Sequence, residues 1–165
     1  MVAARHWLVA NGIAQEDAIF LNGGSYGGFL TLWGLARRPE LWAGGLATVA
    51  IADWVTNYED AADAMKGAFR MWHGGSLEEV HERYVNSSPA TYAENITAPL
   101  LVIQGYNDTR TTQRQMEQFE AKLKALGKPI EVIWFDAGHG GLSTDEAITF
   151  QEKQIELALS VLKQH

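Results

Sequence analysis

The chain has 165 residues, of which 47% are hydrophobic, so we expect a single domain with one buried core. Its formal net charge is -7 and its basic residues are scattered along the chain, which argues against binding to nucleic acid. It contains no cysteine, which excludes disulfides, thiolate catalysis and zinc sites built from cysteine.

The first predicted element is a helix over Val2 to Val9. Asn11-Gly12 follows it, and both residues accept the left-handed turn that often ends a helix. This helix is apolar and begins almost at the initiator methionine, with no strand before it to pack against. We therefore expect the chain to correspond to the latter part of something larger.

A strand, a turn and a helix come next. Ala18 to Leu21 is a short apolar run, typical of a strand that is buried on both faces. Apolar residues then recur at helical spacing from Phe29 to Ala36, and Arg37-Arg38-Pro39 supplies positive charge and a breaker where this helix ends. The sequence therefore predicts one βα unit here.

The turn of this unit holds a serine between glycines. Gly23-Gly24-Ser25-Tyr26-Gly27-Gly28 contains the pattern G-x-S-x-G, in which small neighbours allow a strained turn and expose the Ser25 hydroxyl. The backbone N–H of Tyr26 would then face a developing oxyanion. The alternative is a glycine-rich turn with a helix-capping serine, because this pattern also arises by chance.

Three further apolar segments predict strands at 44–50, 99–104 and 130–135, with helices between them. This alternation indicates an α/β fold with a mostly parallel sheet of about four strands flanked by helices. The clearest helix lies between the last two strands and stops at Gly127-Lys128-Pro129.

The last predicted helix begins with a capping box formed by Ser143 and Glu146. Four aliphatic residues lie on one face of this helix: Ile148, Ile155, Leu159 and Leu162.

A less regular insert at 53–95 separates the second and third strands. We expect it to contain one helix capped by Ser76 with Glu79 and another opened by Ser88-Pro89. An aromatic-rich insert after a strand suits a cap that faces the substrate, with Trp54 and Trp72 as candidate pocket walls. The alternative for either ring is simple packing of the insert on the sheet.

An acid and a histidine follow the last two strands. Asp108 comes after the third strand and His139 after the fourth, so both can meet Ser25 at one edge of a parallel sheet. His139 would take the proton of Ser25, and Asp108 would orient His139 and stabilise its imidazolium. Asp136 is the rival acid, but it would need to fold back on His139 within a short loop.

The sequence lacks the residue patterns that metal-dependent and nucleotide-dependent enzymes need. The sequence has no H-E-x-x-H, no histidine and carboxylate group at metal spacing and no glycine-rich nucleotide loop, so we expect neither a metal nor another cofactor. We also find no apolar run near the ~18 residues of a membrane span and no leader peptide. We therefore expect a cytoplasmic protein that does not associate with membranes.

The order serine, acid, histidine is that of the α/β-hydrolases. Three segments together resemble the catalytic domain of the prolyl oligopeptidase family of serine peptidases: Gly23 to Gly28, Gly105 to Arg110 and Ala137 to Gly140. The likeness extends over nearly the whole chain. It implies that Ser25 is the nucleophile, Asp108 the acid and His139 the base. It also implies a truncated α/β-hydrolase fold, with 1–165 as one domain equivalent to the C-terminal half of the family's catalytic domain.

Two departures from this family matter. Thr111-Thr112 stands where the family usually has an apolar residue and proline, which we expect to loosen the acid loop. The family's β-propeller and the first half of its hydrolase domain have no counterpart in this sequence. That half carries the second oxyanion donor, and its loss would lower activity by ~10²- to 10³-fold.

The sequence therefore predicts a serine hydrolase that cleaves small esters, and also short peptides, through an acyl-enzyme. The alternative is a non-catalytic fragment or assembly subunit that retains the triad without a complete oxyanion hole. Ile19-Phe20-Leu21 would be an unpaired edge strand, so we also expect a homodimer or a higher homo-oligomer.

Overall fold

A computed structural model describes residues 1–163 of the chain. Its centre is a four-stranded sheet in the order β1-β2-β3-β4, and all three pairings are parallel. The strands are β1 (Phe20–Gly24), β2 (Gly44–Thr48), β3 (Leu100–Gly105) and β4 (Ile130–Phe135). The predicted α/β fold with a parallel sheet of about four strands is therefore confirmed.

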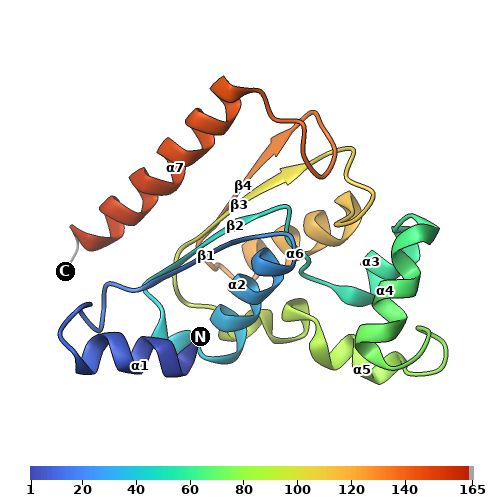
Figure 1. Ribbon diagram of the computed structural model, residues 1–165, viewed down its shortest axis with the longest axis horizontal. Coiled ribbons are helices and arrows are strands. Elements are labelled where there is room, and N and C mark those ends of the chain that lie inside the picture. Colours follow the sequence, from blue (N-terminus) through green and yellow to red (C-terminus); the bar gives the residue numbers. More distant parts are fainter. Residues whose placement is uncertain (164–165) are drawn as a thin grey trace.

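Helices cover both faces of this sheet (Figure 1). Helices α2 (Tyr26–Arg37) and α6 (Gln113–Ala125) pack on one face, and α7 (Thr144–Leu162) crosses the other. The N-terminal helix α1 (Val2–Ala10) lies near the 3₁₀ turn η1 (Pro39–Leu41), to which Arg5 donates a hydrogen bond.

The two faces of the sheet bury different amounts of apolar surface. The main core lies between the sheet and α2 and α6, where Leu35, Val102 and Phe119 are buried. Side chains alternate along a strand, so Ile103 points to the opposite face. There it packs with Phe135 in a smaller cluster that Phe150 of α7 covers.

The chain between β2 and β3 forms a helical region with its own core. It contains α3 (Trp54–Asp60), α4 (Asp63–His73), α5 (His81–Ser87) and the 3₁₀ helix η2 (Pro89–Asn95). Buried aromatic rings from α3, α4 and α5 pack together there with Phe29 of α2: Trp54, Tyr58, Phe69 and Tyr84.

One predicted helix in this region is wrong. Ser76 and Glu79 do form a capping contact, in which the Ser76 N–H donates to the Glu79 carboxylate at 2.8 Å. Val80 then leaves the helical region with φ -133° and ψ 38°, so the contact closes a single turn and α5 begins only at His81. The helix predicted to begin at Ser88-Pro89 is present as the 3₁₀ helix η2, in which Pro89 is the first residue.

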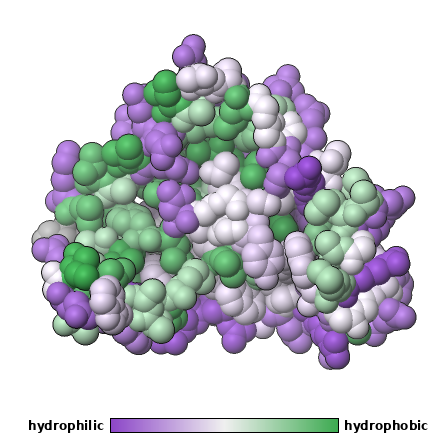
Figure 2. Space-filling model, in the orientation of Figure 1, coloured by the Kyte–Doolittle hydropathy of each residue, from purple (hydrophilic) through white to green (hydrophobic). Residues whose placement is uncertain are grey.

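Helix α7 begins with the predicted capping box, but its aliphatic stripe faces away from the sheet. The four stripe residues are between 39% and 53% exposed: Ile148, Ile155, Leu159 and Leu162. Figure 2 shows hydrophobic surface gathered on the left of the molecule, the side on which α1 and α7 lie in Figure 1. Within residues 1–163, no helix is long and apolar enough to cross a membrane.

Candidate active site

The junction between β1 and α2 holds Ser25 in an uncommon backbone conformation. Its φ is 55° and its ψ is -119°, a region that residues other than glycine rarely adopt. Two hydrogen bonds hold it there: the Ser25 N–H donates to the Thr48 carbonyl at 2.9 Å, and the Phe29 N–H donates to the Ser25 carbonyl at 3.0 Å. The turn is thus tied both to β2 and to the first turn of α2.

The glycines around Ser25 differ in how much space a side chain would have at each position. A Cβ on Gly23 would collide with the Gly27 carbonyl, and a Cβ on Gly28 would lie 2.8 Å from the Cβ of Ala50. A Cβ on Gly27 would have no neighbour within 4 Å outside its own helix backbone. The sequence pattern predicts that a side chain would be obstructed at both glycine positions of G-x-S-x-G. This prediction holds for position 23 and is wrong for position 27.

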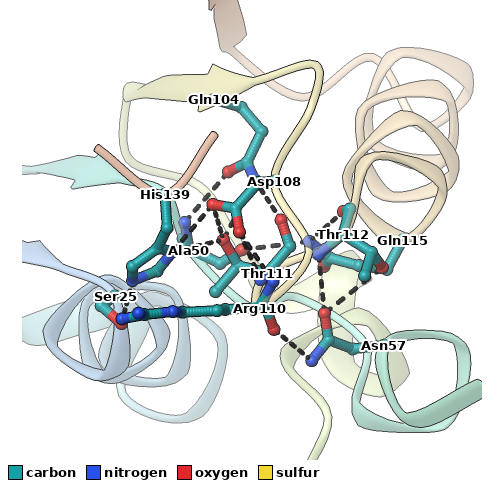
Figure 3. Close-up of polar contacts among 10 residues, drawn as sticks. All are labelled: Ser25, Ala50, Asn57, Gln104, Asp108, Arg110, Thr111, Thr112, Gln115 and His139. Carbon is teal, nitrogen blue, oxygen red and sulfur yellow. Dashed lines mark hydrogen bonds and ion pairs between the residues drawn. The ribbon is translucent and has the colours of Figure 1, made fainter. Parts of the chain in front are cut away.

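The three residues predicted from the ends of the strands come together (Figure 3). His139 Nε2 lies 2.8 Å from Ser25 Oγ, and His139 Nδ1 lies 2.8 Å from Asp108 Oδ2. Asp136 instead accepts a hydrogen bond at 2.9 Å from the side-chain amide of Asn107. The acid that contacts His139 is therefore Asp108.

The Asp108 carboxylate is fully buried and accepts four hydrogen bonds. Its Oδ1 accepts from the backbone N–H groups of Arg110 at 2.8 Å and Thr111 at 2.9 Å. Its Oδ2 accepts from the Thr111 hydroxyl at 2.7 Å as well as from His139. Four donors complement a negatively charged carboxylate, and they hold it in one orientation.

The acid loop is not loosened by Thr111-Thr112. Both threonines are buried, at 1% and 4% exposure. The Thr112 N–H donates to the side-chain oxygen of Asn57 at 2.8 Å, and the Asn57 amide donates to the Arg110 carbonyl at 3.0 Å. Helix α3 therefore anchors the loop that carries Asp108.

Two buried glutamines extend this network and were not predicted from the sequence. Gln104, in β3, accepts from the Ala50 N–H at 3.0 Å and donates to the Thr111 carbonyl at 2.7 Å. Gln115, in α6, accepts from the Ala52 N–H at 2.7 Å and donates to the Thr112 carbonyl at 2.9 Å. The one signal in the sequence is Gln104 itself, a polar residue at the end of an apolar strand.

The predicted oxyanion donor lies at the start of α2. As the first residue of that helix, Tyr26 has a backbone N–H without an acceptor one turn earlier in the helix. This N–H immediately follows Ser25 in the chain, so it is available to a group bound at the serine hydroxyl.

The two predicted pocket tryptophans occupy different positions. Trp72 is 47% exposed, and its ring centroid lies 5.1 Å from that of Tyr26, which is 46% exposed. Trp54 is only 1% exposed and packs against both rings, at 6.4 Å from Tyr26 and 5.8 Å from Trp72. The rings of Tyr26, the residue after Ser25, and Trp72 therefore form one exposed aromatic surface, with Trp54 buried behind them.

Comparison with known proteins gives one consistent result. The model of the prolyl oligopeptidase family matches residues 1–165. Dipeptidyl aminopeptidase BIII of Pseudoxanthomonas mexicana is 30% identical over 153 residues, which cover 85% of this chain and 21% of that protein.

Solved structures show the same fold. A puromycin-hydrolysing peptidase of Mycobacterium tuberculosis superposes with a TM-score of 0.89 at 24% identity, over 98% of this chain and 24% of that one. Acylaminoacyl peptidase of Pyrococcus horikoshii superposes with a TM-score of 0.78 at 28% identity, over 97% of this chain and 26% of that one. The chain spans about a fifth of the length of the first curated relatives that it matches.

Proposed function

Because the chain belongs to the prolyl oligopeptidase family of serine peptidases, we propose that it cleaves peptide or ester bonds through an acyl-enzyme on Ser25. The observation that carries this proposal is the continuous hydrogen-bonded line from Ser25 Oγ through His139 to Asp108, with 2.8 Å at both links. In this line the imidazole is within reach of the proton it must accept.

The proposed reaction has two halves. His139 Nε2 takes the proton of Ser25 as Oγ attacks the carbonyl carbon, which forms a tetrahedral oxyanion. Asp108 stabilises the imidazolium, which then gives its proton to the leaving amine or alcohol as the bond to the acyl carbon breaks. A water, deprotonated by His139, attacks the acyl-serine in the same way and releases the acid.

The Tyr26 backbone N–H is the proposed donor to the oxyanion. The relatives are about four times as long as this chain. Small esters with good leaving groups are the proposed substrates for assay, because their cleavage demands less stabilisation of the oxyanion than peptide cleavage does.

The exposed rings of Tyr26 and Trp72 are the proposed contact surface for an apolar group of the substrate. Trp54 would act indirectly, since it is buried behind both rings. Short peptides and small esters both fit a surface of this kind. The names of the relatives, a dipeptidyl aminopeptidase and an acylaminoacyl peptidase among them, support a peptide as the natural substrate class.

A fluorophosphonate, which reacts with activated serines, tests the proposal. We expect one adduct per chain by intact mass in the unmodified protein, none in Ser25→Ala, and ester turnover that disappears in His139→Ala. Equal labelling of the unmodified protein and Ser25→Ala would show that Ser25 is not the nucleophile. Trace ester turnover that is the same in all three proteins would favour a non-catalytic subunit that retains the triad by descent.

We also propose that the chain forms a homodimer through the side on which β1 lies. Within residues 1–163, strand β1 is an edge strand and pairs with β2 on one side. Large apolar residues are also exposed on α1 and on the loop between α1 and β1, Trp7 at 59% and Ile13 at 62%, and along the stripe of α7. A two-fold axis would bury the same surface on both copies.

A further inference from the structure

The hydroxyl of Thr111 contacts the same carboxylate oxygen that accepts from His139. Thr111 Oγ1 lies 2.7 Å from Asp108 Oδ2, and His139 Nδ1 lies 2.8 Å from that oxygen. Thr111 is 1% exposed, so water does not compete for this contact. Figure 3 shows the carboxylate between these two side chains.

The surrounding groups determine which way the hydroxyl proton points. The Ala50 N–H can only donate, so the Gln104 atom that it contacts at 3.0 Å must be the amide oxygen. The Gln104 amide nitrogen therefore faces Thr111 and donates to its carbonyl at 2.7 Å and to its hydroxyl oxygen at 3.3 Å. The hydroxyl oxygen acts as the acceptor toward Gln104, and its proton is left for Asp108.

We propose that Thr111 is a positioning residue for the acid of the triad, and that Gln104 holds it in place. This inference rests on the proposed function. The Thr111 hydroxyl keeps Asp108 Oδ2 directed toward His139, while the backbone N–H groups of Arg110 and Thr111 restrain only Oδ1. Without the hydroxyl, Oδ2 keeps His139 as its one donor, and only the two hydrogen bonds to Oδ1 then restrain rotation of the carboxylate away from the imidazole.

Two pairs of variants isolate the hydroxyl. Unmodified protein and Thr111→Val differ by the hydroxyl at nearly constant shape, and Thr111→Ser and Thr111→Ala differ by the hydroxyl when the methyl group is absent from both. The backbone N–H that donates to Asp108 Oδ1 is present in all four proteins. If the valine variant fails to fold, the serine and alanine pair still carries the test.

Ester hydrolysis and thermal melting are measured for all four proteins. We expect Thr111→Val to lower kcat by about tenfold, which equals ~1.4 kcal/mol of transition-state stabilisation, with little change in KM. Thr111→Ser should retain most of the activity, and Thr111→Ala should lose about as much as Thr111→Val. Two outcomes would overturn the proposal: valine turning over like threonine, or serine as impaired as alanine.

A second measurement does not depend on turnover. The proton between His139 Nδ1 and Asp108 gives a downfield NMR resonance, which is assigned by its absence in His139→Gln. We expect Thr111→Val to move this resonance and Thr111→Ser to leave it in place. An unmoved resonance in Thr111→Val would overturn the inference, whereas absence of fluorophosphonate labelling in the unmodified protein would count against the proposed function alone.

Discussion

The two glycines on either side of Ser25 allow a test at the scale of single residues. A Cβ on Gly23 meets the Gly27 carbonyl, a backbone atom that moves only if the first turn of α2 moves. We expect Gly23→Ala to destabilise the protein by ~1–3 kcal/mol and to abolish ester turnover, because overpacking displaces Ser25.

Gly27→Ala is the matched control for this change. Its methyl group meets no atom within 4 Å outside the backbone of its own helix. Alanine is also favoured over glycine inside a helix by ~0.5–1 kcal/mol. Thermal melting should therefore show a midpoint that is unchanged or higher in Gly27→Ala and lower in Gly23→Ala. A fall in both would mean that the turn rejects any side chain next to Ser25.

A buried histidine outside the triad should make stability depend on pH. His73 is 8% exposed, its Nδ1 lies 2.9 Å from the Phe69 carbonyl, and its ring stacks on Tyr84 at 3.8 Å. Burial lowers the pKa of His73 below the ordinary value of 6.5, although the hydrogen bond to Phe69 opposes this shift.

The unfolded chain therefore binds a proton at His73 at a higher pH than the folded chain does. Neutral His73 contributes to the free energy of unfolding above about pH 6.5, the pKa of histidine in the unfolded chain. This contribution is lost as pH falls toward the lower pKa of His73 in the folded state. We expect the free energy of unfolding to fall between pH 7.5 and 5.5, and to fall less in His73→Gln. The exposed His81 supplies the control, and His81→Gln should keep the slope of the unmodified protein.

At the scale of elements, α1 is joined to the rest of the fold through one buried guanidinium. Arg5 is 4% exposed and donates to the Leu41 carbonyl at 2.7 Å and to the Glu16 carbonyl at 2.8 Å. It thereby connects α1 with η1 and with the loop that leads into β1. Its ion pair with the exposed Glu16 carboxylate, at 3.4 Å, is the weaker part of this arrangement.

Replacing Arg5 with methionine keeps an unbranched side chain with an apolar stem and removes every hydrogen-bond donor of the guanidinium. The Leu41 carbonyl, in a buried contact, and the Glu16 carbonyl, in a part-buried one, then lose their donor, which should lower the free energy of unfolding by ~1–3 kcal/mol. Arg38→Met is the control, because Arg38 is half exposed and its ion pair with Glu40 is worth ~0–1 kcal/mol. Urea denaturation measures both. Equal midpoints for the two variants would mean that α1 packs without help from Arg5.

At the scale of the whole molecule, the exposed apolar surface on the β1 side should determine the oligomeric state. We expect sedimentation to show a homodimer at micromolar concentration that dissociates on dilution. Ile155→Glu should shift this equilibrium toward monomer without loss of thermal stability, since Ile155 is 53% exposed on the outer face of α7. A charge there opposes burial against a second copy.

Met71→Glu provides the comparison for this experiment. Met71 is 74% exposed on α4, in the helical region between β2 and β3 rather than on the β1 side, so its substitution should leave the equilibrium unchanged. A folded monomer at every concentration would refute the dimer. Because the relatives are about four times as long as this chain, it would also direct attention to further polypeptide as the group that covers this surface.

The sequence by itself was sufficient for the number of strands, their parallel arrangement and the residues that meet at their carboxyl ends. It was wrong about the first strand, which lies at Phe20–Gly24 instead of 18–21 and contains no buried residue, because it is an edge strand. The correctly predicted features depend on local patterns: apolar runs predict buried strands, and the end of a parallel strand has a known position in the sheet. Ser25, Asp108 and His139 each directly follow such a run or its short turn, so they could be named without coordinates. The start of α7 after Ser143 was also predictable from the sequence, because the residues of a capping box lie within one helical turn.

The tertiary structure alone decided which groups surround those residues. Gln104, Gln115 and Asn57 lie on three different elements, and their hydrogen bonds join residues up to 65 positions apart, which no periodicity in the sequence records. The space around Gly27, the burial of Trp54 and the outward face of Ile155 likewise depend on what packs against them. A residue type limits what a side chain can do, but the neighbours that satisfy, bury or expose it are set by contacts formed only when the whole chain folds.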